Sequence, residues 1–453
     1  MIAPFLRAFL LLLVLTLVDA HLNFTSVIVA NWTEVADGPS GRDYHAMAPL
    51  SDGRLLMYGG NTQGKDGLYK CFNDTYIYTP SSFTSSNGKG VTAAGEGTWT
   101  KVADGPDARQ SHAMASLSDD GRVLMYGGSK IVNETYQITV ILNDTYIYTP
   151  SSFTLSNGKG VTAGGGTWTK VADGPSARYA HAMAPLSDGR VLMYGGWLSD
   201  EDHNIIFNDA YIYTPSSSMS FDGKGVTAGG GTWTKVADGP SARQGHAMAP
   251  LSGGRVLMYG GGDYNIALND TYIYTPSSPM SSDGKGVTAG GGTWTKVAAG
   301  PSGRSDHAMA PLSGGGKVLM YGGGNRLHHY LNDTYIYTLS SSMSSNGKGV
   351  TAAGEGSWTK VADGPDGRFA HAMAPLSNGR VLMYGGYHLK FLPLPSGYLN
   401  DTWIIESPEV PSICCQTKSS DHKDDKAKCA TFLDSKSCDD YSKGFGDFCI
   451  WKC

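Results

Sequence analysis

The chain has 453 residues, a formal net charge of −5 and only 17% charged residues. That charge balance gives no basic surface of the kind that binds nucleic acid, so we expect no nucleic-acid partner. Gly accounts for 61 residues, nearly double its usual share of about 7%.

Residues 1–20 combine one Arg, an apolar stretch of about eleven residues and a Val-Asp-Ala ending. This pattern is typical of a secretory signal peptide with small residues at the cleavage site. The stretch is too short to span the roughly 30 Å of bilayer hydrocarbon. We therefore expect a secreted, extracellular mature protein with no membrane span.

Eight Asn-x-Thr sequons follow, and in a secreted chain each is a candidate glycosylation site. They lie at Asn23, Asn31, Asn73, Asn133, Asn143, Asn269, Asn332 and Asn400. Five of them are Asn-Asp-Thr at the same place in a repeat, so they are either glycan acceptors or by-products of that repeat. Asn208 occupies the same place but is followed by Ala210, which removes the sequon.

The repeat begins Arg-x-x-His-Ala-Met-Ala and ends Leu-Met-Tyr-Gly-Gly, and it occurs six times. In the third copy, residues 182–186 and 191–194 are short apolar runs separated by a Ser-Asp-Gly turn. Such runs predict a β-hairpin. A Tyr-Ile-Tyr segment and a Thr-Trp-Thr-Lys segment are rich in strand-forming residues. We therefore predict four strands in each repeat.

Six tryptophans that share one place in the repeat lie 61 to 69 residues apart, at Trp32, Trp99, Trp168, Trp233, Trp294 and Trp358. Six four-stranded sheets arranged radially form a β-propeller. No Trp-containing strand follows the last repeat, whereas residues 32–35 precede the first one. We therefore predict an all-β, six-bladed propeller that this N-terminal strand closes.

Paired glycines after an apolar strand, a following Tyr and Trp, and an upstream Arg-x-x-His resemble the Kelch repeat from Trp32 to about Glu406. The resemblance implies a propeller, but Kelch propellers include binding modules and enzymes alike. Its enzymes include copper radical oxidases similar to galactose oxidase and metal-free sugar mutarotases. The oxidases need a Cys–Tyr crosslink, and Cys71 is the only propeller cysteine, so that branch is disfavoured.

The sequence predicts a propeller over 21–406, a linker over 407–413 and a separate module over 414–453. The module holds six cysteines, Cys414, Cys415, Cys429, Cys438, Cys449 and Cys453. Three disulfides are expected because so short a segment has little core, and zinc is the rival interpretation. Ser/Gly-rich inserts such as 150–167 predict long loops, and their Gly-Lys-Gly spacing does not fit a phosphate-binding loop.

Six Arg and six His recur once per repeat, and we interpret them as structural residues that hydrogen-bond between blades. They are Arg42, His45, Arg109, His112, Arg178, His181, Arg243, His246, Arg304, His307, Arg368 and His371. A ring of six histidines could instead hold a metal. We favour the structural role and expect neither metal nor cofactor.

The repeats differ most in the segments after Gly-Gly and in the two residues inside Arg-x-x-His, which share one predicted face. A constant scaffold with variable loops is typical of a binding site, and neutral drift is the alternative. The candidate ligand-binding residues are Trp197, Asp200, Asp202, His203, Tyr264, Arg326, His328, His329, Tyr330, Tyr387 and His388.

These features favour a secreted, monomeric binding or adhesion module that recognises an extracellular glycan or protein. No catalytic residue can be assigned. The alternative is a metal-independent, mutarotase-like enzyme, because such an enzyme needs only a few acids and bases at the channel mouth.

Overall fold

The computed structural model describes residues 31–35, 37–81, 97–102, 104–117, 121–151, 165–171, 173–216, 220–221, 226–227, 230–263, 265–277, 291–297, 299–325, 329–340, 356–389, 397–406, 416–417 and 449–450. Contacts divide the chain into Val29–Ser407 and a second unit of Met1–Ile28 with Pro408–Cys453. In the second unit, only the paired strands β35 (Gln416–Thr417) and β36 (Cys449–Ile450) are described. The predicted signal peptide, Asn23, the linker and the cysteine pairing lie outside the described residues.

Six four-stranded antiparallel sheets, blades 1 to 6 in chain order of their first strands, make up the first unit. The first strands are β2 (Ala46–Pro49), β8 (Ala113–Ser116), β14 (Ala182–Pro185), β22 (Ala247–Pro250), β26 (Ala308–Pro311) and β30 (Ala372–Pro375). The second strands are β3 (Leu55–Tyr58), β9 (Val123–Tyr126), β15 (Val191–Tyr194), β23 (Val256–Tyr259), β27 (Lys317–Tyr321) and β31 (Val381–Tyr384).

The third strands are β6 (Thr75–Thr79), β12 (Thr145–Thr149), β18 (Ala210–Thr214), β24 (Thr271–Thr275), β28 (Asp333–Leu339) and β34 (Thr402–Ile405). The fourth strands are β7 (Thr98–Lys101), β13 (Thr167–Lys170), β21 (Thr232–Val236), β25 (Thr293–Lys296), β29 (Gly356–Asp363) and β1 (Trp32–Val35). The predicted four strands per repeat are therefore confirmed.

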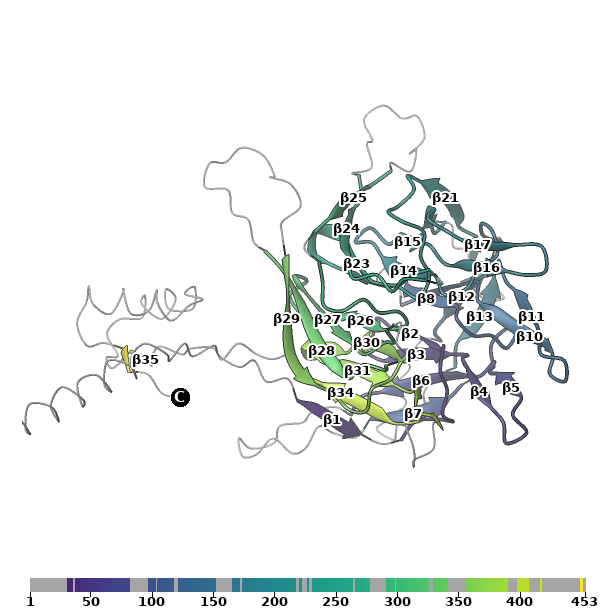
Figure 1. Ribbon diagram of the computed structural model, residues 1–453, viewed down its shortest axis with the longest axis horizontal. Helices are drawn as coiled ribbons and strands as arrows, with labels where there is room; N and C mark the ends of the chain where they lie inside the picture. Colours follow the sequence, from purple (N-terminus) through teal and green to yellow (C-terminus); the bar gives the residue numbers. More distant parts are fainter. Residues whose placement is uncertain are drawn as a thin grey trace, which may run out of the picture. The chain divides into compact units, whose positions relative to one another are not determined.

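The N-terminal strand β1 completes blade 6 and closes the ring (Figure 1). It pairs antiparallel with β34, and Trp32 lies opposite Ile405 while Val35 lies opposite Thr402. The first strands of the six blades also contact one another in a closed circle, because β30 contacts β2 as β2 contacts β8. These pairings confirm the predicted closure of a six-bladed propeller.

The second strand of each blade is buried on both faces, which explains why its Val-Leu-Met-Tyr run lacks polar alternation. In β3, all four side chains have no exposed surface. Leu56 and Tyr58 pack with blade 2, while Leu55 and Met57 pack with blade 6. Each blade thus contributes alternate side chains to two interfaces, and the core is continuous around the ring.

The Gly-Gly pair ends the second strand where the next blade comes closest. In blade 3, Gly195 and Gly196 have φ values of 68° and 99°, which side chains other than Gly rarely adopt. A Cβ on Gly195 would lie 2.7 Å from the carbonyl oxygen of Arg243 in blade 4. The N–H of Gly196 donates to that same oxygen at 2.9 Å. The pair therefore serves both the turn and the blade-to-blade contact.

Short hairpins in the segments after Gly-Gly were not predicted. They are β4 (Asn61–Gln63) with β5 (Tyr69–Cys71), β10 (Ser129–Asn133) with β11 (Ile138–Ile141), β16 (Trp197–Ser199) with β17 (Asn204–Ile206), and β32 (Tyr387–His388) with β33 (Gly397–Tyr398). A further pair, β19 (Ser220–Phe221) with β20 (Val226–Thr227), lies in one Ser/Gly insert. Most residues of the inserts lie outside the described part of the chain.

The repeated tryptophans hold neighbouring blades together. Trp168 Nε1 in blade 2 donates to Thr75 Oγ1 in blade 1 at 3.0 Å, and four further Trp–Thr pairs repeat this bond around the ring. Blade 3 is the exception, because Ala210 stands where the other blades have Thr. Trp294 Nε1 is consequently buried without a hydrogen-bond partner among the described residues.

Replacing Ala210 with Thr is expected to stabilise the propeller by about 1 kcal/mol, the net value of a typical buried hydrogen bond. Thr fits at the equivalent fully buried positions of the other blades, Thr75 among them. Urea unfolding of A210T against A210V is the measurement, since Val has the shape of Thr without its hydroxyl. Equal unfolding midpoints for the two variants would contradict the missing Trp294 bond.

Candidate functional site

The two variable parts of each repeat lie side by side, as the sequence predicts. In blade 3, Tyr179 inside Arg-x-x-His forms a β-bridge with Trp197, the first residue after Gly-Gly. The same bridge joins Asp43 to Asn61 in blade 1 and Phe369 to Tyr387 in blade 6. We call the surface formed by these residues and the segments after Gly-Gly the loop face.

The residue just before each repeated His forms a closed ring of backbone hydrogen bonds around the central channel. The N–H of Ser111 donates to the carbonyl of Tyr44 at 2.9 Å, and the N–H of Tyr44 donates to Ala370 at 2.9 Å. All six ring residues have φ values of 51–64°. They are Tyr44, Ser111, Ala180, Gly245, Asp306 and Ala370. Their side chains vary while their backbones are fixed, so the ring presents five kinds of residue from six blades.

The repeated Arg is a structural residue of its own blade. Arg42, with no exposed surface, donates to both carboxylate oxygens of Asp74 at 2.5 and 3.1 Å and to the carbonyl of Gly59 at 2.9 Å. The other five Arg–Asp pairs repeat this geometry. The bond between blades is instead made by the Arg backbone carbonyl, which accepts from the second Gly of the preceding blade.

The six repeated histidines and the six ring residues together line a cavity of about 130 Å³. Each ring packs edge-on against the Tyr that ends the preceding blade's second strand, as His45 does on Tyr384 with centroids 5.2 Å apart. Their ring nitrogens have no side-chain hydrogen bond of normal geometry within the described residues. A hydrogen bond with the Tyr384 backbone raises the pKa of His45 and so acts against the effect of burial. Ring packing against the Tyr of the preceding blade therefore joins neighbouring blades at each repeated His.

The histidines are neutral at physiological pH. Burial, followed by the Arg42 guanidinium, lowers the pKa of His45 to about 3, and burial with Arg178 does the same for His181. No group of three or more potential metal ligands occurs among the described residues. The histidine ring is thus an uncharged, packed layer of the channel.

Aromatic side chains from blades 6, 1 and 5 meet at the mouth of the channel. Phe369 lies 4.7 Å from Tyr330, 5.7 Å from Tyr387 and 6.0 Å from Tyr44, measured between ring centroids. Tyr398 lies 5.1 Å from Tyr387. All five rings are half-buried, so they form an aromatic wall that is still open to a ligand.

Two carboxyl groups adjoin this wall. Burial and the Asp306 charge raise the pKa of Asp43 to about 8, and burial raises the pKa of Asp306 to about 6 although Ser305 donates to it. Asp43 is 4% exposed, and its Oδ1 has no hydrogen-bond partner among the described residues. At neutral pH, Asp43 is therefore mainly protonated while Asp306 is mainly ionised.

The contribution of Asp43 to stability should fall as pH rises from about 4 to 8, because Asp43 keeps a proton in the folded state that the unfolded chain has lost. The buried histidines, whose pKa is lowered from 6.5, act in the opposite sense below that pH, so the Asp43 contribution is measured as the difference between D43N and wild type. The slope for one group is at most about 1.4 kcal/mol per pH unit. Asp43→Asn should flatten this dependence and gain stability at pH 9 relative to wild type, as measured by urea unfolding at pH 5, 7 and 9. Asp107→Asn is the control, because Lys130 lowers rather than raises the pKa of Asp107. An unchanged slope in D43N would contradict this assignment.

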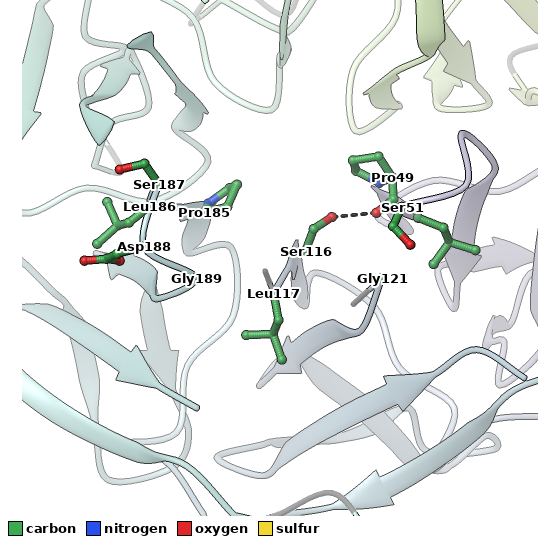
Figure 2. Close-up of a pocket in the computed structure, with 11 residues that line it drawn as sticks. Pro49, Ser51, Ser116, Leu117, Gly121, Pro185, Leu186, Ser187, Asp188 and Gly189 are labelled. Atoms are coloured by element: carbon green, nitrogen blue, oxygen red, sulfur yellow. Dashed lines mark hydrogen bonds between the residues drawn. The ribbon is translucent and has the colours of Figure 1, made fainter. Parts of the chain in front are cut away.

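The opposite end of the channel is hollowed as well (Figure 2). A cavity of about 720 Å³ lies between the turns of blades 1, 2 and 3, lined by Leu50, Leu117 and Leu186 with serines and prolines. Ser116 Oγ donates to the Pro49 carbonyl at 2.6 Å across it. The residues that line this cavity belong to the part of the repeat that is nearly identical in all blades, so the cavity shows little variation from blade to blade.

Large apolar side chains are exposed only on the loop face, within the described part of the chain. They are Tyr69, Val132, Tyr136, Ile138, Val140, Ile205 and Ile266, exposed by 41–77%. The hairpins of blades 1 and 2 also touch, since Tyr69 N–H donates to Gln137 Oε1 at 3.1 Å and Lys70 lies 3.8 Å from Glu134.

Residues 96–282 match the family model described as the KLHDC2/KLHL20/DRC7 Kelch-repeats domain. This part of the chain carries Kelch repeats. The other blades have the same sheet order and the same Arg–Asp and Gly-Gly contacts as the matched part.

Three curated relatives are 21–25% identical to the chain over the aligned residues, which make up 11% to 60% of the relatives' own lengths. It is 25% identical over 303 residues to Adagio-like protein 1 of Oryza sativa subsp. japonica, covering 64% of this chain and 40% of the relative. It is 24% identical over 378 residues to multiple epidermal growth factor-like domains protein 8 of Mus musculus, covering 79% of this chain and 11% of the relative. It is 21% identical over 264 residues to N-acetylneuraminate epimerase of Pasteurella multocida, covering 52% of this chain and 60% of the relative.

Among solved structures, the one titled "Structure of YjhT" matches 83% of this chain and 98% of its own, with a TM-score of 0.54 and 14% identity. That likeness concerns the fold alone. Among the described residues, no helix is long and apolar enough to cross a membrane.

The structure brings some of the candidate residues of this propeller together and separates others. Tyr330 and Tyr387 belong to the aromatic wall, and His388 Nδ1 contacts the Gly367 carbonyl. His329 is exposed, with its N–H donating to Asn325. Trp197 stacks on Tyr179 in blade 3, 5.0 Å between centroids. Tyr264, Arg326 and His328 lie outside the described residues.

The acidic cluster of blade 3 satisfies itself. Asp200 Oδ1 accepts from the N–H groups of Asp202 and His203 and contacts His203 Nδ1 at 2.9 Å, so this tip is a turn and not a metal site. Cys71 is a free, half-buried thiol whose pKa burial raises to about 11.

Sequence reasoning missed Asp43, Tyr44, Asp306, Phe369 and Tyr398 as site residues. The signal was present for four of them, because they occupy the variable positions inside Arg-x-x-His. Tyr398 had no such signal, since it joins the wall only through the β32–β33 pairing.

Proposed function

We propose that this protein is a secreted Kelch-propeller binding module that recognises an extracellular protein through its loop face. The observation that carries this proposal is the distribution of exposed apolar side chains, which in the described residues is confined to that face. Clustered exposed apolar and aromatic groups mark interaction surfaces. Secretion is proposed from the signal-peptide pattern of residues 1–20 and from the sequons.

The hairpins of blades 1 and 2 are the proposed centre of contact. Tyr136, Ile138 and Val140 are exposed by 77%, 50% and 41%, and the neighbouring hairpin adds Tyr69. A protein partner that covers this surface would bury large apolar side chains with little loss of conformational entropy. The reason is that the β10–β11 pairing already fixes the hairpin backbone.

The test is binding of the purified secreted chain to an array of extracellular proteins and glycans. A variant with Tyr136, Ile138 and Val140 changed to Ser should lose binding to its protein partner. A control with Ser187→Ala and Asp188→Asn, at the opposite end of the channel, should keep it. Binding lost only in the control would contradict the loop-face assignment, and binding to glycans alone would contradict the protein-partner class.

A second candidate function is sugar processing at the channel mouth, and the two carboxyl groups favour it. Asp43 carries a proton at neutral pH while Asp306 does not, and such a pair supplies a general acid and a general base. The relation to an N-acetylneuraminate epimerase points to the same chemistry. NMR exchange between the anomers of N-acetylneuraminate, with D43N and D306N compared with wild type, tests it. Equal exchange with and without the protein would rule it out.

A further inference from the structure

Each residue of the Asn-Asp-Thr motif has a separate place in the structure. In blade 2, the Asp144 carboxylate accepts from Nη1 and Nη2 of Arg109 at 2.6 and 2.9 Å. Thr145 Oγ1 accepts from Trp233 Nε1 of the next blade at 3.1 Å. Asn143 is exposed. The scaffold therefore explains the Asp and the Thr, whereas the exposed Asn side chain makes no hydrogen bond within the described residues.

The exposed Asn recurs at the rim of the loop face in five blades, at Asn73, Asn143, Asn269, Asn332 and Asn400. In each of them the Thr that completes the sequon is fully buried. Asn133 differs, because it lies within the β10–β11 hairpin and its Oδ1 accepts from the Tyr136 N–H at 2.9 Å. It is not part of the rim.

Blade 3 departs from the motif by one residue, and the departure has a structural cost. Ala210 leaves Trp294 Nε1 buried and unpaired among the described residues, which costs on the order of 1 kcal/mol or more. The same residue removes the sequon at Asn208, whose side chain is exposed like the other five. A buried polar group left without a partner calls for an explanation.

The neighbourhood of these Asn residues supplies one. Val140, Ile205 and Ile266 are exposed by 41%, 42% and 56%, and each lies three residues before the rim Asn of its blade. An N-linked oligosaccharide is bulky and solvating, so one at Asn269 would stand beside Ile266. One at Asn143 would lie at the base of the β10–β11 hairpin, away from the turn that carries Tyr136. In blade 3, Asn208 is not part of a sequon, so no oligosaccharide would cover Ile205, which lies on the same hairpin as Trp197.

We propose that N-linked oligosaccharides occupy the five rim sites and that blade 3 is a glycan-free sector of the loop face, next to the blade 2 hairpin in the proposed centre of contact. Ala210 keeps this sector open at the expense of the Trp294 hydrogen bond. The inference rests on the proposed secretion, because N-glycans are added only in the secretory pathway.

The first measurement is glycan occupancy of the full chain expressed in cultured eukaryotic cells, from peptide masses after enzymatic release in heavy-oxygen water. A secreted chain modified at the five rim Asn residues and not at Asn208 is the expected result. A secreted chain with unmodified rim sites would overturn the inference while leaving the proposed function standing. A chain retained in the cytosol with no glycans would overturn both.

The sector itself is tested by A210T, which recreates a sequon at Asn208. The double variant N208Q/A210T is the matched control, because it restores the Thr hydroxyl without an acceptor Asn. The accessibility probe is an engineered Cys at Ile205 or Ile266, with Cys71 changed to Ser, and loss of each unmodified peptide under a bulky maleimide is followed by mass spectrometry.

Labelling at position 205 should be several times faster than at 266, and N269Q should remove that difference. A210T should slow labelling at 205, whereas N208Q/A210T should not. Equal rates at 205 and 266 in the glycosylated protein, or equal slowing by both Ala210 variants, would overturn the glycan-free sector.

Discussion

Replacing Arg178 with Met is expected to destabilise the propeller by about 3–5 kcal/mol, the usual cost of removing one partner from a buried ion pair. Arg178 has no exposed surface. It donates to Asp209 at 2.6 and 3.1 Å, to the Gly195 carbonyl at 2.8 Å and to the Ser176 carbonyl at 3.1 Å. Its guanidinium also lies 4.0 Å from the centroid of Phe207. The variant leaves the Asp209 carboxylate and the Gly195 carbonyl without their donor, while the Ser176 carbonyl keeps the Tyr126 hydroxyl at 3.0 Å.

Urea unfolding of R178M measures the effect, and Lys170→Met in the preceding blade is the control. Lys170 pairs with Asp173 at 3.0 Å, but both side chains are more than half exposed, so its loss should cost less than about 1 kcal/mol. The double variant R178M/D209L should recover part of the loss, because it leaves no unpaired carboxylate. A cost for R178M no larger than that for K170M would contradict the structural role of the repeated Arg.

Trp32→Ala is the second large effect, expected at about 3 kcal/mol or more as for other Trp truncations at packed sites. Trp32 lies in β1, where its Nε1 donates to Thr334 Oγ1 at 3.1 Å and its ring lies 4.8 Å from that of Tyr321. These contacts join blade 6 to blade 5. They exist only if the N-terminal strand completes blade 6, so the variant tests the closure of the ring.

Trp168→Ala is the matched comparison, because Trp168 makes the same contacts with Thr75 and Tyr58 within a continuous stretch of blades. Closure predicts that W32A and W168A shift the thermal midpoint by similar amounts. Trp197→Ala, in a hairpin of the loop face, should shift it little. A W32A midpoint equal to wild type beside a destabilised W168A would show that β1 does not close the ring.

The propeller could be predicted because its determinants are local and repeated. Each Val-Leu-Met-Tyr run and each Gly-Gly pair has the same neighbours in every blade, so the repeat period alone indicates the number of sheets. Ring closure was predictable for the same reason, since Trp32 has the repeat position of Trp168 and no partner repeat of its own.

The site was harder to predict because it depends on which blades become neighbours. Residues 44, 330 and 369 are distant in sequence, and closure of the ring brings Tyr44 within 6.0 Å of Phe369. The raised pKa of Asp43 arises from burial and from Asp306, a residue of another blade. Variability inside Arg-x-x-His marked the positions, but only the geometry shows that their side chains converge.

The hairpins after Gly-Gly were missed because their sequences share no common pattern. Ile138 and Val140 lie in β11, which pairs with β10. Their exposure could not be predicted, because the apolar sequence of β11 resembles that of a buried strand. Trp197 was a good candidate for the loop face, yet it lies with Tyr179 in blade 3, away from the ring contacts that define the aromatic wall.

The most direct test of the account is hydroxyl-radical footprinting of the secreted protein with the partner that the array identifies. Binding through the loop face predicts protection of Tyr136, Ile138 and Tyr69, while Leu50 and Leu186 at the opposite end of the channel stay unchanged. Protection of the opposite end, with the hairpins of blades 1 and 2 as reactive as in the free protein, would contradict it.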